Sequence, residues 1–497
     1  MVLRTLVTAT AAVVLLAGCS GGDDKSADAK DSGNNQTPST PSAPAVTPYD
    51  PPKAFQANYA YSLPEVKGHT FAPKVGMVGM TAVANSLRGV AGQSAAGPAK
   101  PWQTPATETT DGSVVINDAT APFSVQLDGK PAVAVAYYQR VKGAGTTKPG
   151  LSVLFRWLDP ADGKLLSEAT VDATALLGDA EVNSSSPGDF RQVSVDPATG
   201  QMAVGLGPSS MIGAKSGIIT VIGDPATKKG VAVPFTEPAG ISKGVLVAAQ
   251  GKEERQTVSL LDAATGRVTK SGLLPGLESI NATGSNGGKY AYLYGLKYDK
   301  SLTENVGYLY AVDPATGTVV QTRSALKRGD YLARYRCQAD GQKAVVCTAD
   351  QVATGEIIGF DDTTGKKAWG FTGESAGRVV PAVTAAFHGM VYATVNQKPI
   401  LLNALTGQDV PVPTPTIPTG PDTGGPTSGE TATQNPTDGS TDGSTPSGGS
   451  SDAPVVAQPD YKPQSPTSVS EYGGAYLTEA SYGDGFSGTL QILKAVG

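Results

Sequence analysis

The sequence predicts an all-β protein, and specifically a β-propeller of four-stranded blades. A turn motif that begins with Asp or Asn recurs six times between residues 158 and 407. From Gly163 to Gly407 there are 244 positions in five intervals, a period of about 49 residues, which is the length of one blade. β-rich segments flank each turn, and patterns typical of long helices are missing.

The turn motif has a physical basis. An Asp or Asn oxygen at its first position accepts hydrogen bonds from backbone N–H groups two residues on. A following Pro presets φ for a type I turn, and a closing Gly adopts the left-handed conformation that ends a bulged hairpin. Each motif is predicted to join the last two strands of a blade. The residues assigned to this role are Asp159, Gly163, Asp224, Asp262, Gly266, Asp313, Gly317, Asp361, Gly365, Asn403 and Gly407.

The first two strands of each blade are predicted as hairpins, which completes six blades between about residues 113 and 413. Residues 466–497 add three strands, and a closed ring needs a fourth from the N-terminal part of the chain. The candidates for that strand are residues 74–84 and 112–117. We therefore predict seven blades, with eight as the alternative because residues 54–110 are difficult to assign.

Two cysteines, Cys337 and Cys347, lie in one predicted hairpin. With a two-residue turn at Asp340 and Gly341 they would be out of register and too far apart to bond. A five-residue loop over 340–344 would place them opposite each other. A disulfide is the preferred prediction, and two buried free thiols are the alternative.

The first 18 residues are predicted to be a signal peptide. Arg4 precedes an apolar to weakly polar run from Leu6 to Leu16, which is shorter than the roughly 20 residues needed to span a bilayer. The run ends in Leu16-Ala-Gly-Cys19, which resembles the lipobox of bacterial lipoproteins. This resemblance implies a lipid on Cys19 and a location on the extracytoplasmic face of the cell membrane. The alternative is an ordinary signal peptide with a chance Cys.

Two segments have compositions that do not support a packed core. Residues 19–60 are predicted to be a lipidated Cys followed by a disordered linker, because large apolar side chains are scarce there. Residues 411–465 are a low-complexity insertion rich in Pro, Thr, Gly and Ser, either a flexible arm or a tolerated loop expansion. The propeller is assigned to 61–410, with its final blade at 466–497.

The repeats resemble those of the quinoprotein-type, or PQQ-like, β-propellers. Gly359–Trp369 matches that repeat, and Ala311–Gly317 matches its first part. In this family, the repeated Trp locks adjacent blades together. Quinoprotein dehydrogenases also hold a quinone and calcium and carry adjacent paired Cys, and no such pair is present here. The resemblance therefore implies the architecture, and we expect neither a bound cofactor nor a metal.

Recognisable catalytic sets are missing from the sequence. The two His residues, His69 and His388, have no neighbouring metal ligands, and no nucleophile elbow or phosphate loop is found. Carboxylates from different blades, which a glycosidase would use, stay open as an alternative. The net charge is −6 with no basic block, which excludes nucleic acid as an expected partner.

Together these features predict a monomeric, lipid-anchored binding or scaffold module that acts without catalysis. Its propeller loops would bind an envelope protein, a peptide or a glycan. Tyrosines between 290 and 310 are either a partner-binding face or ordinary strand packing. The alternative function is an extracytoplasmic enzyme, either a quinoprotein-like dehydrogenase or a carbohydrate-active enzyme.

Overall fold

The computed structural model describes residues 47–413 and 464–497, apart from short gaps, and Val46–Gly497 form one compact unit. The gaps are 64–65, 68–72, 98–99, 108–111, 144, 147, 183, 185–187, 208–216, 252–255, 285, 300–303, 327–333, 350–354, 376 and 483–484. The predicted signal peptide, Cys19 and most of the insertion lie outside the described residues. Within the described part, no helix has the length and apolar character needed to cross a membrane.

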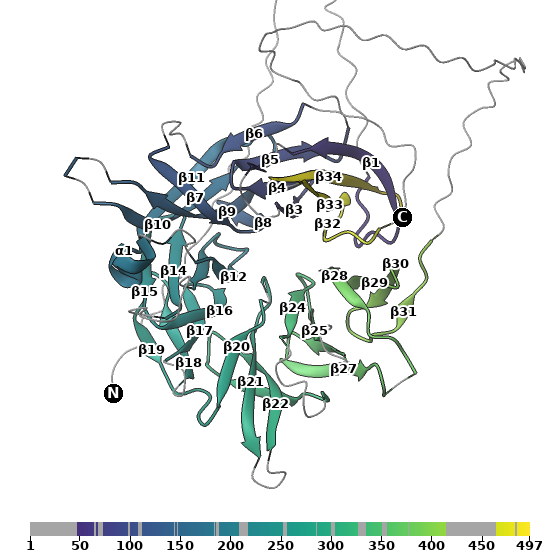
Figure 1. The fold of residues 1–497 in the computed structure, drawn as a ribbon. Coiled ribbons are helices and arrows are strands. Elements are labelled where there is room, and N and C mark those ends of the chain that lie inside the picture. The colour runs from purple at the N-terminus through teal and green to yellow at the C-terminus, as the bar shows by residue number, and fades with distance from the viewer. Residues whose placement is uncertain are drawn as a thin grey trace, which may run out of the picture. The chain divides into compact units, whose positions relative to one another are not determined.

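The strands form eight antiparallel sheets arranged as blades around a common axis (Figure 1). Blade 1 contains β3 (Lys74–Val78), β4 (Thr81–Ser86), β5 (Gly89–Ser94) and β6 (Trp102–Pro105). Blade 2 contains β7 (Val114–Ala119), β8 (Phe123–Leu127), β9 (Lys130–Val141), β10 (Gly150–Leu158) and β11 (Leu165–Asp172). Both β7 and β8 pair with the same edge of β9, so they form one interrupted inner strand.

The next three blades follow the simple order of four consecutive strands. Blade 3 contains β12 (Phe190–Val195), β13 (Met202–Leu206), β14 (Ile219–Asp224) and β15 (Lys229–Val233). Blade 4 contains β16 (Thr236–Ser242), β17 (Val245–Gln250), β18 (Thr257–Asp262) and β19 (Val268–Lys270). Blade 5 contains β20 (Ser279–Ala282), β21 (Ala291–Asp299), β22 (Glu304–Val312) and β23 (Val319–Arg323).

The last three blades include the one that closes the ring. Blade 6 contains β24 (Arg336–Ala339), β25 (Ala344–Ala349), β26 (Glu356–Asp361) and β27 (Lys366–Thr372). Blade 7 contains β28 (Ala382–Phe387), β29 (Met390–Val395), β30 (Lys398–Asn403) and β31 (Asp409–Val410). Blade 8 contains β32 (Ser468–Ser470), β33 (Gly473–Tyr482) and β34 (Gly485–Ala495), with β1 (Phe55–Ser62) and the short β2 (Val66–Lys67) on its outer edge.

The eight-bladed alternative is confirmed, and the first count of seven is wrong. Residues 74–105 form a complete blade, so the candidate segment 74–84 supplies β3 and β4 rather than a closing strand. The other candidate, 112–117, lies in the inner strand of blade 2. The closing strand is β1, which pairs with β34 from Phe55 opposite Ala495 to Ser62 opposite Thr489. Blade 1 was missed because its last two strands are joined without the Asp-containing turn motif.

The apolar core lies between neighbouring blades. Each sheet packs against two others, so the central strands bury side chains on both faces. In β9, for example, every residue from Ala132 to Tyr138 is buried. One apolar cluster joins β9 and β10 to β12, β13 and β14, which shows the contact between blades 2 and 3. Two single-turn helices, α1 (Thr174–Leu177) and α2 (Asp179–Val182), lie between these blades in the sequence.

Strand direction gives the ring two distinct faces. Loops that join the first to the second strand, and the third to the fourth, lie on one face, which we call the turn face. Loops that join the second to the third strand, and one blade to the next, lie on the other, which we call the loop face. The first strand of each blade lies nearest the axis (Figure 1). All six predicted repeat turns join the third and fourth strands of blades 2–7, and therefore lie on the turn face.

Candidate functional site: a pocket lined by the inner strands

The predicted turn residues have a structural role. In all six repeat turns the first Asp or Asn side chain accepts a backbone N–H hydrogen bond two or three residues on, at 2.8–3.0 Å. The closing glycines have positive φ, from 65° to 71°. In blade 3 this position is Lys228, with a φ of 56°. The hydroxyl of Thr265 lowers the pKa of Asp262, and that of Thr363 lowers the pKa of Asp361.

The three tryptophans each tie one blade to the next. Trp102 donates its indole N–H to the Pro160 carbonyl at 3.0 Å, and Trp369 donates to Ala404 at 2.8 Å. Both bonds reach the repeat turn of the following blade. Trp157 donates to the Gly200 carbonyl, in the first hairpin turn of blade 3, at 2.8 Å. The Trp at the repeat position therefore joins blades at two places, one of which, Trp102, the sequence reading did not assign.

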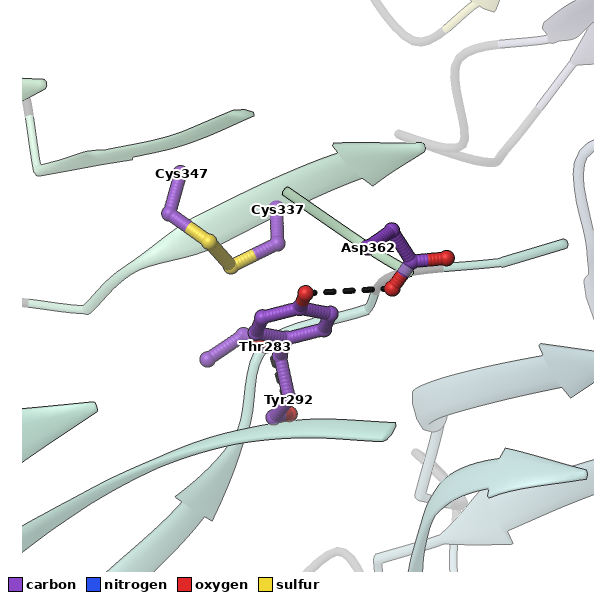
Figure 2. Close-up of a disulfide and its surroundings, with 5 residues drawn as sticks. All are labelled: Thr283, Tyr292, Cys337, Cys347 and Asp362. Carbon is purple, nitrogen blue, oxygen red and sulfur yellow. Dashed lines mark hydrogen bonds between the residues drawn. A yellow bond between two sulfur atoms is a disulfide. The ribbon is translucent and has the colours of Figure 1, made fainter. Parts of the chain in front are cut away.

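Three buried aspartates, two in inner hairpin turns and one in a repeat turn, make further contacts between blades. Asp340 accepts three N–H bonds within its own turn and a fourth from Gly389 of blade 7, at 2.8–2.9 Å. Asp196 similarly accepts from Ala198 in its own turn and from Lys243 of blade 4. Asp362 accepts a 3.0 Å bond from the Tyr292 hydroxyl of blade 5 (Figure 2), and its burial raises the pKa of this carboxyl.

Cys337 and Cys347 form a disulfide between β24 and β25 (Figure 2). They are direct cross-strand partners, and the last pair in the ladder is Ala339 with Val345, so the loop runs from Asp340 to Ala344 and is closed by a hydrogen bond from the Asp340 N–H to the Ala344 carbonyl. This is the five-residue register rather than the two-residue turn. The Cys337 N–H also donates to the Thr283 carbonyl at 2.8 Å, which ties blade 6 to blade 5. The disulfide thus stiffens the inner hairpin of blade 6.

A hollow of about 730 Å³ is lined by the first strands of four consecutive blades. Charged residues in its lining are Arg191 of β12, Glu237 of β16, Arg336 of β24 and Arg334 just before β24. Most of these residues lie at or near the start of an inner strand, and Gly207 and Ile218 flank a connection between second and third strands. The charged part of the hollow therefore lies towards the loop face, whereas Thr283 and Gly284, which follow β20, line it from the side of the turn face. Its remaining polar lining comes from Gln192, Asn281, Thr283, Tyr294, Tyr335 and Gln338.

Strand alternation explains why polar side chains line this pocket. Along 334–338 the even-numbered residues are exposed or half-buried, whereas Tyr335 and Cys337 are buried in the apolar cluster of blades 5 and 6. In β20, likewise, Asn281 is exposed and its neighbour Ile280 is buried. A period of two directs the exposed set of side chains towards the pocket, whereas Tyr335 and Cys337, which also border the hollow, belong to the core.

The charges in the pocket influence one another. Burial raises the pKa of Glu237 to about 7, against the opposing effect of Arg334 and Arg191. Arg191 also pairs with Asp189 at 2.9 Å. Among the described residues, neither Arg334 nor Arg336 has an ion-pair partner. The described lining of the pocket therefore carries excess positive charge at pH 7, on a chain whose net charge is −6.

A buried network fixes the segment that carries Arg334 and Arg336. The Tyr335 hydroxyl donates to the carboxylate of Glu356, which also accepts from Ser324 at 2.8 Å and from the Ala325 N–H at 3.0 Å. The Tyr335 ring packs on Tyr294 with centroids 4.9 Å apart. Burial raises the pKa of Tyr335, so its hydroxyl stays protonated and acts as a donor.

The pocket was not predicted from the sequence. The predicted turn residues all lie on the turn face, and of the predicted site residues only Cys337 lines the hollow. His388 lies in a turn, where it pairs with Asp50, and His69 is outside the described residues. Tyr292, Tyr294 and Tyr310 are buried, which favours packing over a binding face, and of these three only Tyr294 also borders the hollow. Asp361 caps its own turn, and Asp362 makes a contact between blades.

No cluster of metal-ligating residues is found in the described part of the chain. The available signal was the pair of arginines two residues apart beside a predicted inner strand.

No protein-family model and no curated protein matches the chain. Solved structures similar to it include the Dos1 propeller (12% identity, 66% of this chain and 76% of that one, TM-score 0.36). The propeller domain of the Trilobed protease from Pyrococcus furiosus has 10% identity, 60% and 83% coverage and a TM-score of 0.34. An uncharacterised protein, lmo1340, from Listeria monocytogenes has 9% identity, 75% and 99% coverage and a TM-score of 0.33. At these values the similarities carry no information about function.

Proposed function

We propose that the protein is a lipid-anchored extracytoplasmic binding module of the cell envelope, tethered through Cys19, that acts without catalysis. In this proposal the loop face of the propeller, with its pocket, meets an envelope component. The PQQ-like repeat and the lipobox-like end of the apolar run support a tethered propeller. The observation that supports the proposal most directly is that the N-terminal segment joins the ring on one particular face.

That segment arrives on the turn face. The Tyr49 N–H donates to the Glu471 carbonyl, in the turn between β32 and β33, at 2.7 Å. Asp50 pairs with His388 in the turn between β28 and β29. β1 then runs along blade 8 towards the loop face. A tether ahead of residue 47 would therefore pull on the turn face, leaving the pocket on the side away from the tether.

The two described ends that flank the insertion lie on the other side. Residue 413 follows the last strand of blade 7, and residue 464 precedes the first strand of blade 8, so both belong to the loop face. The low-complexity segment leaves and rejoins the ring on the face that carries the pocket. This placement supports a division between an anchoring face and a binding face.

Affinity capture of the tagged, lipidated protein from cross-linked cell envelopes tests the proposal. The first control is the signal, Cys19 and the linker without the propeller. We expect envelope components enriched only with the propeller, and a loss of that enrichment when Arg334 and Arg336 are replaced by Gln. Equal enrichment by the control would contradict binding by the propeller. A Cys19→Ala variant should leave the membrane fraction, and its retention there would contradict the lipid anchor.

A further inference from the structure

We infer that the pocket binds an anionic group, a carboxylate or a phosphate, carried by a small hydroxylated molecule. This inference rests on the proposed binding function and specifies its ligand. Three arginines and one glutamate line the hollow, and of these three arginines only Arg191 forms an ion pair with another described residue. Within the described part of the chain, Arg334 and Arg336 have no carboxylate in ion-pair contact, which leaves their guanidinium groups to bind an anion.

The type of side chain points to the ligand. A guanidinium is planar and always charged, and it presents a fork of donors that matches two oxygens of a carboxylate or phosphate. Two such groups at positions 334 and 336 project to the same side of an extended chain. Such a pair suits an anion with several oxygens better than it suits a cation or an apolar ligand.

The pocket is also held in shape before a ligand arrives. Between the two arginines, Tyr335 is fixed by Glu356, Ser324 and the Tyr294 ring. Directly after them, Cys337 is bonded to Cys347. Because the backbone on both sides is constrained, less conformational freedom is lost when an anion is bound, which improves affinity.

Neutral polar groups complete the lining. The amides of Gln192, Asn281 and Gln338 each offer a donor and an acceptor. Such groups pair with the hydroxyls of a sugar-like molecule. A hollow of about 730 Å³ lies within the range of pockets that hold small molecules.

Glu237 makes this site sensitive to pH. Its burial within the lining raises its pKa to about 7. Below that pH the carboxyl is protonated and neutral, and the arginines alone face the ligand. Above it the carboxylate repels an anion and competes for Arg334 and Arg191. Affinity for a carboxylate, whose own charge does not change in this range, is therefore expected to fall several-fold as the pH rises from 6 to 8, and the Glu237→Gln variant should lose most of this fall. A phosphate monoester gains charge over the same range because its second pKa is about 6, so the carboxylate probe is the one that tests the role of Glu237.

The test is a calorimetric titration of the intact protein with three probes of similar size, namely glucuronate, glucose 6-phosphate and uncharged glucose. At pH 6 and low salt we expect at least one anion to bind about tenfold or more tightly than glucose, and added salt to weaken that binding. Whichever of the two anions binds more tightly identifies the carboxylate or the phosphate as the preferred group.

Two double variants that each remove two positive charges separate a site from a general charge effect. Arg334→Gln with Arg336→Gln should weaken anion binding by about tenfold per arginine, since a charged hydrogen bond contributes about 1.5 kcal/mol or more. The double variant Lys228→Gln with Arg267→Gln changes two residues on the turn face and should leave anion binding unchanged. Circular dichroism would establish that both variants fold.

Three results would overturn the inference. They are glucose binding as tightly as the anions, equal losses in the two double variants, and no saturable binding of either anion at millimolar concentration. Envelope capture that persists alongside any of these would keep the binding function and reject only the anionic ligand. Loss of capture with intact anion binding would reject the proposed function alone.

Discussion

The turn face and the loop face differ in how their connections are built. On the turn face the repeat turns of blades 2–7 are four to six residues long, and a side-chain oxygen of their first Asp or Asn is bonded to the backbone in every one. On the loop face, the connection between β11 and β12 has 17 residues, and the one between β31 and β32, which contains the insertion, has 57. The turn face also holds the three Trp contacts between blades. The charged side of the pocket, where Arg334 and Arg336 have no ion-pair partner among the described residues, lies towards the loop face.

This difference separates stability from binding. Bonds on the turn face join each blade to its neighbour and so hold the ring closed. On the loop face, charged side chains are exposed to a ligand, and a buried hydrogen-bond network and the disulfide hold the strand that carries them. Substitutions on the turn face should therefore change the free energy of unfolding and leave anion affinity unchanged, and the pocket substitutions should do the reverse.

The largest effect on stability is expected from Trp157→Ala. This indole is fully buried, stacks on Phe155 with centroids 6.2 Å apart and bonds blade 3 through Gly200. Its loss leaves a cavity and an unpaired carbonyl, and should destabilise the protein by about 3–5 kcal/mol. Chemical denaturation measures this change. Trp157→Phe, which keeps a ring but removes the N–H, should cost less. If both variants cost nothing, the turn face does not hold the blades together.

A smaller loss is expected from Asp340→Ala. Its carboxylate accepts four backbone N–H bonds, one of them from blade 7, so the substitution leaves buried donors unpaired. We expect a loss of about 2–4 kcal/mol, measured by denaturation. Asp340→Asn keeps the oxygen that serves its own turn and should lose less, which isolates the bond to Gly389. A changed affinity for the anionic probes in either variant would contradict the separation between the two faces.

The same division explains which features the sequence could predict. The Asp-containing repeat turns could be predicted because a short turn depends on local residue types, and these turns predict the blades and the strand order. Local turn types also gave the two alternative registers for Cys337 and Cys347. Blade 1 has no such turn, and so the ring was first counted one blade short. The pocket brings together Arg191, Glu237 and Arg336 from positions up to 145 residues apart in the sequence (336 − 191). No local pattern specifies that proximity, because it arises only when the inner strands of four blades meet at the axis.

The smallest effect tests the turn geometry itself. Lys228 stands where five other repeat turns have Gly, and its φ of 56° is costly for a residue with a side chain. Lys228→Gly should therefore stabilise the protein by about 0.5–1 kcal/mol, after the greater chain entropy of Gly in the unfolded state is allowed for. The reciprocal variant, Gly163→Ala, should destabilise, because its added Cβ would lie 2.3 Å from the Trp102 ring. Thermal or chemical denaturation of the two variants gives the comparison. If the free energy of unfolding changes in the same direction in both variants, the choice of residue at the end of these turns is not determined by the positive φ or by the Trp102 indole that lies against Gly163.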